Sequence, residues 1–335
     1  MPDIGFRFEA IRPGANTRPF TPTVAGTMSF DLTREVPRTI TGVIAPPDQW
    51  AVIDVRTDQI KAYLIVDGTD YPMGFFAFTE LTRQKDVVLD EAGDPADMIS
   101  TGLGDRCTLL IRNTGAAQTI LPAFDPSQEM ITILSNSGLP YAVAGAANLS
   151  ITSITWDGST TDLSKIKQLG TLAGHRPLWA DNNGVIRSVA SQVIDTEIIP
   201  LADLQPVASS VAITDRFLTA PNRVIVSDNS SPSYAIRGQW DAPASAPHSE
   251  ANRGYVLTRL EELQGLGSGA HAENVAATIG EAYTARSLSA RILPTSVLDG
   301  PQIISYDGAN WLVTSWEVAM TPGADMSINA EELIP

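Results

Sequence analysis

Short alternating or apolar runs, separated by turn residues, make up the first part of the chain. Residues 51–55 and 60–66 form two such runs, and a turn at Asp67-Gly68 leads into the alternating stretch YPMGFFAFTEL. Residues 107–112, CTLLIR, read as a further strand. Alternation with a period of two is typical of strands that bury one face. Many strands with few helices predict a β-barrel or a β-sandwich for this region.

The pattern changes at about residue 126, and a helix with a hairpin after it follows. Asp162 can cap the start of this helix and Gly174 can end it, while residues 176–180 and 185–189 flank the turn sequence DNNG. The stretch is therefore predicted to be an αββ unit. Its helix shows apolar residues at every third position, namely Leu163, Ile166, Leu169 and Leu172.

Strand-like runs return after residue 206, in VASSVAITDRF, NRVIVSD and YAIRGQW. A disordered loop is expected at residues 241–249, DAPASAPHS. A helix is predicted over residues 270–286, with Val275, Ile279 and either Ala282 or Tyr283 on one face. Residues 301–320 read as two strands joined at residues 307–310.

These patterns divide the chain into three predicted parts. They are an N-terminal β-barrel domain over residues 1–125, a middle α/β insert with the helix and hairpin over 126–205, and a C-terminal β-rich domain with one helix over 206–335. A chain of 335 residues also exceeds the length at which one hydrophobic core keeps growing. The predicted fold class is mainly β with an α+β insert.

Charge and cysteine usage narrow the function classes. The chain has 22 Lys and Arg against 38 Asp and Glu, which gives a formal net charge of −16. Such a charge is unfavourable for binding nucleic acid. The single Cys107 excludes an intramolecular disulfide and a thiolate metal cluster, and we expect it to be a buried strand residue. The N-terminus lacks a signal peptide and no run of about 18 apolar residues occurs, so we expect a soluble chain without a membrane span.

The histidines and the glycine-rich stretch do not predict catalysis or cofactor binding. His175, His248 and His271 are the only three, and the sequence has no G-x-S-x-G nucleophile motif and no metal-ligand spacing. His175 follows the predicted helix, where an imidazolium can meet the helix dipole. GLGSG, residues 265–269, lacks the Gly-Lys-Ser/Thr of a phosphate loop and is interpreted as a connector, with Ser268 capping the next helix.

Acidic side chains leave one enzymatic alternative open. Asp181, Asn182 and Asn183 suit a turn better than a calcium loop, because no later Glu follows at EF-hand spacing. The pairs Asp54/Asp58 and Asp67/Asp70 are conceivable glycosidase carboxylates, and six Trp are available to line a sugar cleft. We predict no catalytic, cofactor-binding or metal-binding residue, and a carbohydrate-binding or glycan-cleaving β-protein is the alternative.

The order of these stretches resembles the tail hub proteins of bacteriophages, the hub-like minor tail proteins of siphophage tail tips. DQIKAYLIVDGTDYPMGFFAF looks like the N-terminal region of minor tail proteins of actinobacterial phages. Residues 163–189 look like the middle helix-hairpin unit of such hubs. NRVIVSD, SAPHSEANRG, residues 270–286 and NWLVTSWEVAM resemble the later landmarks in the same order.

The resemblance implies two β-barrel-like hub domains around a small α/β domain, and no enzymatic activity. It also implies a homotrimer that closes or adapts the tail tube, opens for DNA ejection, and contacts the distal tail protein ring, the C-terminus of the tape-measure protein, and tail-tip or fibre proteins. DNA would pass the lumen without sequence-specific binding, and an acidic lumen would not retain phosphate. The expected location is the virion tail tip, assembled in host cytoplasm. A contractile-injection or gene-transfer particle is an alternative setting.

Overall fold

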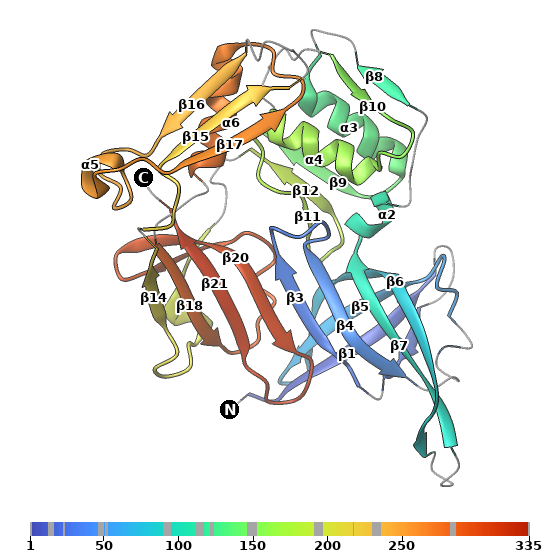
Figure 1. The fold of residues 1–335 in the computed structure, drawn as a ribbon. Helices are drawn as coiled ribbons and strands as arrows, with labels where there is room; N and C mark the ends of the chain where they lie inside the picture. The colour runs from blue at the N-terminus through green and yellow to red at the C-terminus, as the bar shows by residue number, and fades with distance from the viewer. Residues whose placement is uncertain are drawn as a thin grey trace.

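A computed structural model describes most of the chain (Figure 1). It covers residues 2–333 except 13–16, 23, 46–49, 51–52, 90–94, 112–116, 121–123, 146–152, 191–196, 217, 230–235 and 282–285. Side chains of residues 83–98 are likewise outside the description. Part of the predicted strand at residues 51–55 falls in one of these gaps, and its described residues 53–55 lie in no strand, so the strand prediction is wrong there. No helix of the described residues is long and apolar enough to cross a membrane.

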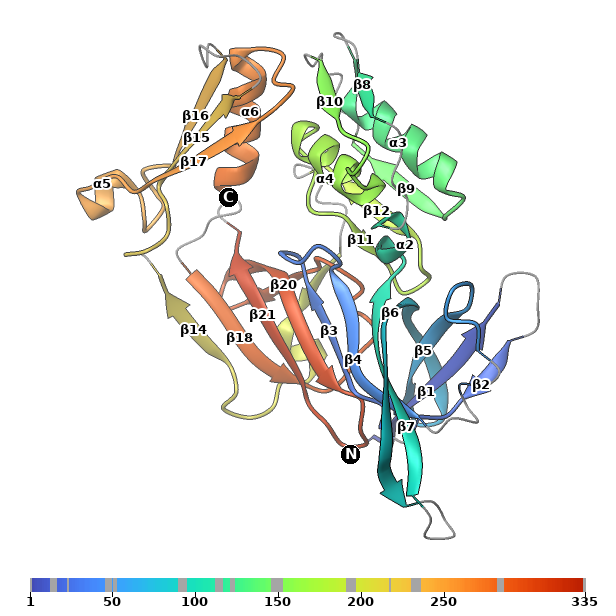
Figure 2. The same ribbon diagram turned by 45° about the vertical axis from the view of Figure 1, so that its right-hand side comes forward.

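One 13-stranded sheet organises the lower part of the molecule and curls into two barrel-like halves (Figures 1 and 2). The fold class is therefore mainly β, as predicted. Isolated bridges Val24↔Ile44 and Pro206↔Ile292 add contacts beyond the strands in the two halves. Along the sheet the strands are β14 (Ala212–Asp215), β18 (Arg286–Ile292), β21 (Met326–Glu332), β20 (Ala309–Ala319), β3 (Thr27–Asp31), β4 (Arg38–Ala45), β7 (Pro95–Asp105), β6 (Thr69–Leu89), β5 (Gln59–Val66), β1 (Ile4–Ile11) and β2 (Arg18–Phe20), with β13 (Ile198–Pro200) paired to β19 (Ile303–Tyr306) and β19 to β20.

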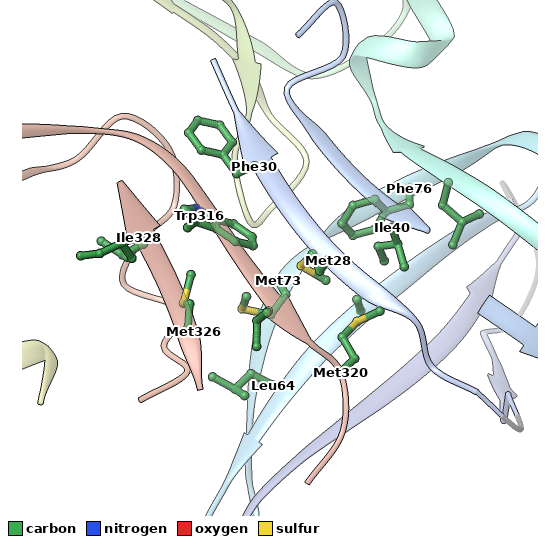
Figure 3. Packing of buried hydrophobic residues seen from close by; sticks show 14 of the residues in the cluster. Met28, Phe30, Ile40, Leu64, Met73, Phe76, Trp316, Met320, Met326 and Ile328 are labelled. Atoms are coloured by element: carbon green, nitrogen blue, oxygen red, sulfur yellow. The ribbon is translucent and has the colours of Figure 1, made fainter. Parts of the chain in front are cut away.

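The two halves join where β3 pairs antiparallel with β20. Phe30 lies opposite Trp316 in this register, and their rings stack with centroids 5.9 Å apart. Both side chains are almost fully buried, in one apolar cluster that draws residues from both halves. Figure 3 shows the Trp316 ring between the ring of Phe30 and the thioethers of Met28 and Met326. Because the β3–β20 ladder is continuous with the strands on either side, the halves form one hydrogen-bonded sheet with a shared core.

An α/β unit follows the first half of the sheet. Its elements pack around the second apolar cluster, which includes Leu163, Ile166 and Leu169 of α4. β12 is the central strand of its three-stranded sheet and pairs antiparallel with β11 and parallel with β9. The elements are α2 (Cys107–Ile111), β8 (Gln118–Ile120), α3 (Pro126–Ser137), β9 (Tyr141–Ala144), β10 (Ile154–Trp156), α4 (Asp162–Leu172), β11 (Trp179–Ala180) and β12 (Ile186–Val189).

A second α/β unit interrupts the other half of the sheet, between β14 and β18. Its central strand β15 pairs antiparallel with β16 and parallel with β17, the same arrangement as around β12. Val224 and Val226 of β15 and Val275 of α6 join the apolar cluster of the first unit, so the two units share a core. The elements of this unit are β15 (Arg223–Asp228), β16 (Arg237–Asp241), α5 (Glu250–Arg253), β17 (Thr258–Leu263) and α6 (Gly269–Glu281). The short helix η1 (Leu201–Leu204) precedes β14 and packs in the apolar cluster of the barrel halves.

Several local predictions are confirmed. β5 and the start of β6 occupy the predicted alternating runs, and the Asp67-Gly68 turn has positive φ at both residues. α4 and the β11–β12 hairpin match the αββ prediction, although Thr161 rather than Asp162 caps the helix through a hydrogen bond from the Ser164 amide. β19 and β20 form the predicted final hairpin. α6 ends at Glu281, and Ala282 and Tyr283 lie outside the described residues.

Two further local predictions are wrong. Residues 107–111 form helix α2 and not a strand, although Cys107 is buried as expected. The Asp105 carboxylate accepts the Cys107 amide at 2.9 Å, which is the geometry of a helix start, and a short apolar run does not distinguish a helix from a strand. The predicted disordered loop at 241–249 buries His248 and Ser249 and leads into α5.

The domain boundaries at 125/126 and 205/206 stay predictions. The elements that pack together in the structure do not begin and end at these two positions. The first α/β unit begins with α2, upstream of residue 126, because the chain leaves the barrel sheet at Asp105. Residues 206–335 hold two described helices, α5 and α6, and a three-stranded sheet outside the barrel sheet. The sequence pattern of strand-like runs did not separate these two kinds of strand.

Replacing the ring at the joint between the halves is expected to destabilise the protein strongly. Trp316→Ala removes the stack on Phe30 and leaves a cavity in the shared core, which costs about 3–5 kcal/mol of unfolding free energy. Urea unfolding of the variant measures this. Leu218→Ala is the control, since Leu218 is 62% exposed and its loss should change the free energy by less than about 0.5 kcal/mol. Equal effects of the two substitutions would contradict the assignment.

Candidate functional site

The three histidines are buried and serve packing. His175 Nδ1 lies 2.8 Å from Ser188 Oγ, and burial lowers the pKa of His175. The neutral ring is therefore favoured, and the expected imidazolium at the helix end is wrong, because the desolvation that comes with burial opposes the charge. His248 is also buried, and burial lowers its pKa. His271 Nε2 lies 2.7 Å from the backbone oxygen of Leu172, which links α6 to the end of α4.

The acidic pairs of the glycosidase alternative are engaged in local structure. Asp58 is buried, pairs with Arg12 through two hydrogen bonds of 2.6 and 2.8 Å, and accepts the backbone amide of Asp54. The hydrogen bonds from Arg12 lower the pKa of Asp58. Asp70 forms an ion pair with Arg7, and the Asp67 carboxylate accepts the Asp3 amide. Asp58, Asp67 and Asp70 are therefore each held by a neighbouring group.

Turn chemistry explains the other polar candidates. Asp181 is buried and accepts the amides of Asn183 and Val185, and its second oxygen accepts from Arg187 Nε at 2.7 Å. Ser268 accepts the His271 amide at the start of α6, as the capping prediction required. Within the described part of the chain, no group of three or more His, Cys, Asp or Glu is placed to hold a metal ion.

The tryptophans do not line a sugar cleft. Five of the six are buried, and the sixth, Trp240, is half-buried against the second apolar cluster. The Cβ that a side chain at Gly280 would add falls 2.2 Å from the Trp240 ring, so α6 covers that ring closely. Aromatic rings used to stack sugars have to present an open face. The buried rings therefore act in packing.

A buried polar junction holds the first α/β unit against both halves of the sheet. Arg38 of β4 has no exposed surface, and its guanidinium lies near the rings of Phe30 and Trp316, at 5.9 and 5.5 Å. Nη1 donates to the Met73 backbone oxygen at 2.8 Å and to Asn182 Oδ1 at 2.6 Å. We call Arg38, Asn182 and Asp299 the junction triad.

Asp299 completes the triad from the other half of the sheet. Its carboxylate lies 3.5 Å from Arg38 Nη2 and accepts the backbone amide of Asn182. Asn182 Nδ2 in turn donates to the Ser296 backbone oxygen at 2.8 Å. Burial raises the pKa of Asp299 to about 6, with the nearby Arg38 charge acting in the opposite direction. The triad thus joins β4, the β11–β12 turn and the loop before β19.

Packing around the triad fixes the same hairpin. Trp179 belongs to the apolar cluster of the barrel halves, while its neighbour Ala180 belongs to that of the α/β units. A Cβ at Gly300 would fall 2.4 Å from Trp179 Nε1, so only glycine permits this approach. Arg106 donates to Gln59 and, at 3.1 Å, to the Gly184 backbone oxygen. The hairpin is anchored from both halves of the sheet, which sets the orientation of the unit.

Asp299→Asn is expected to increase stability more at pH 8 than at pH 4. The folded protein holds the Asp299 proton up to about pH 6, above the ordinary carboxyl pKa of 3.8, so the wild type loses stability from this group as pH rises between those values. The asparagine keeps an acceptor oxygen and does not ionise. The difference between variant and wild type should grow by at most about 3 kcal/mol, reduced by the partial exposure of the side chain. Denaturant unfolding at both pH values measures it, and an equal difference at each pH would refute the assignment.

Asn182→Ala is expected to loosen the hairpin, whereas Asn183→Ala is not. The first change removes the acceptor of a buried Arg38 donor and the bond to Ser296, which costs about 1–3 kcal/mol. Asn183 is exposed in the same turn and provides the matched control. Thermal unfolding and hydrogen exchange of the hairpin report the change. Similar behaviour of the two variants would show that the triad does not hold the hairpin.

Sequence comparisons and structural comparisons give different results. The sequence matches no protein-family model and no curated protein sequence. The fold is similar to a tail protein from Neisseria meningitidis MC58, with a TM-score of 0.62 and 9% identity over 98% of this chain and 97% of that one. It is also similar to the 43 kDa tail protein of prophage MuSo2 from Shewanella oneidensis, with a TM-score of 0.58 and 9% identity over 98% of each chain.

A third solved structure agrees with these two. The prophage tail protein gp18 from Listeria monocytogenes EGD-e has a TM-score of 0.59 and 10% identity, over 97% of this chain and 94% of that one. All three likenesses run over nearly the full length of both chains, including both sheet halves and both α/β units. The chain therefore has the β-rich fold of these tail proteins, in agreement with the fold that the sequence resemblance predicted.

Proposed function

We propose that this chain is a non-enzymatic structural component of a phage tail tip, a hub that assembles as a homotrimer. The observation that carries the proposal is the full-length likeness in fold to tail proteins from three bacteria. Identities of 9–10% mean that the likeness supports the architecture, and the trimer follows from the hub reading of the sequence.

The internal construction suits such a role. Two barrel-like halves in one sheet give a single chain two comparable walls, so that three chains can present six around a sixfold tail tube. The shared core and the junction triad keep these walls in a fixed relation. A ring that closes a tube requires this rigidity, because each subunit contact has to repeat at the same angle for the ring to close.

Charge supports passage of DNA without binding. A formal charge of −16 gives like-charge repulsion toward phosphate, whereas clustered Lys and Arg would retain it. The proposed partners are the distal tail protein ring, the C-terminus of the tape-measure protein, and tip or fibre proteins. The hub would open for DNA ejection, and its place would be the virion tail tip after assembly in the host cytoplasm.

A trimer is expected when the purified chain is measured by multi-angle light scattering at micromolar concentration. A ring contact of ordinary stability buries more than about 1,000 Å², so the trimer should persist on dilution and in 150 mM salt. Labelled chain added to tails that lack it should appear at the tip in electron micrographs. A monodisperse monomer that neither joins tails nor changes on contact with them would overturn the proposal, and hydrolysis of glycans would favour the carbohydrate alternative.

A further inference from the structure

Strand β17 has an open edge in the second α/β unit. It is the last strand in the order β16-β15-β17, and the backbone oxygens of Leu257 and Leu263 accept amides from the β15 side. Successive residues of a strand direct their backbone groups to opposite sides. Thr258, Leu260 and Glu262 therefore direct N–H and C=O away from β15, and within the described residues no backbone group pairs with them.

A groove runs beside the end of this edge. Its volume is about 470 Å³, and it lies between β17 on one side and α4 with β10 on the other. Figure 1 shows β17 on the side of its sheet that faces α4. The wall opposite β17 carries hydroxyl and amide groups, from Thr155, Thr160, Gln168 and Thr171.

The charges and rings of the groove restrict what it can bind. One cation, Lys167, and one anion, Glu262, line it, so no net charge selects an ionic ligand. Lys167 Nζ donates to the Arg34 backbone oxygen at 2.9 Å. Trp156 is buried and donates its Nε1 hydrogen to Gln168 at 2.7 Å, so it presents no open face to a sugar or a base. An uncharged ligand with regularly spaced donors and acceptors fits these walls.

An exposed apolar side chain lies on β17 two residues before Glu262, which lines the groove. Leu260 is 70% exposed in the middle of β17, which is the largest exposure among the large apolar side chains of the described residues. Leu257, which directly precedes β17, is also exposed. Long edges with exposed apolar residues are avoided in isolated proteins, because they pair with other chains.

We propose that the β17 edge and its groove bind an extended, uncharged polypeptide segment of a partner protein by strand addition. The segment pairs its backbone with Thr258, Leu260 and Glu262, and one of its apolar side chains covers Leu260. Polar side chains of the segment face the hydroxyl and amide wall of α4 and β10. That the partner is another tail component rests on the proposed function, whereas the binding of a peptide does not.

The test selects seven-residue linear peptides from a randomised display library on the full-length protein and measures the best of them by fluorescence anisotropy. Leu260→Pro removes one edge N–H without touching the β15 ladder, and Thr171→Trp fills the groove from the other wall. Both variants should weaken binding at least tenfold. Leu260→Thr keeps the N–H and loses only the apolar contact, so it is the matched comparison and should bind at least threefold more tightly than Leu260→Pro.

Three results would overturn the proposal. In the first, no peptide is enriched, and in the second, the enriched peptides bind all variants as they bind the wild type. In the third, Leu260→Pro converts an oligomer of the chain to a monomer, which assigns the edge to a second copy. Thermal unfolding establishes that each variant is folded. If Leu260→Pro does not fold, the binding measured with Thr171→Trp decides the test. Light scattering in the same preparations separates the two proposals. A trimer without peptide binding leaves the hub role standing, and peptide binding by a monomer leaves the edge site standing.

Discussion

The burial of one guanidinium constrains how the whole chain is arranged. Arg38 has no exposed surface, and a buried charge is tolerated only when its donors find acceptors. The acceptors of its two Nη groups come from β6, from the β11–β12 turn and from the loop before β19, which are far apart in sequence. Its Nε has no hydrogen-bond partner among the described residues. The rings of Phe30 and Trp316 lie close to the guanidinium and add a cation–π attraction. Moving any one of these segments would take one acceptor away from the buried guanidinium.

The two shared apolar cores fix the positions of the sheet halves and the α/β units beyond the surroundings of Arg38. The barrel halves share one apolar cluster across the β3–β20 ladder, and the α/β units share another. Trp179 connects the two clusters through the hairpin, and His271 connects α6 to the end of α4. Because packed cores resist gradual deformation, a change of conformation within the chain would have to release the hairpin as a unit.

The sequence predicted what local patterns encode. The period of three in α4, the DNNG turn and the alternation in β5 and β6 are each fixed by residues close in the chain, and the structure has all of them. The start of α2 depends on Asp105 capping a short apolar run, so periodicity alone chose the wrong element. The junction triad was missed because its members are 144 and 261 positions from Arg38, and no spacing rule connects them. The available signal was Arg38 itself, a charged residue at an inward-facing position of the strand-like run RTITGVIA.

The chain shares its fold, but few of its residues, with the three tail proteins. At 9–10% identity, few side chains are shared with the three tail proteins, yet the fold is retained over almost the entire length. Sheets require only alternate burial and compatible turns, so many sequences satisfy them. The proposed partners would therefore be recognised by groups outside the two cores. The β17 edge is such a place, since Leu260 and Glu262 are exposed and contribute little to the packing that the fold itself needs.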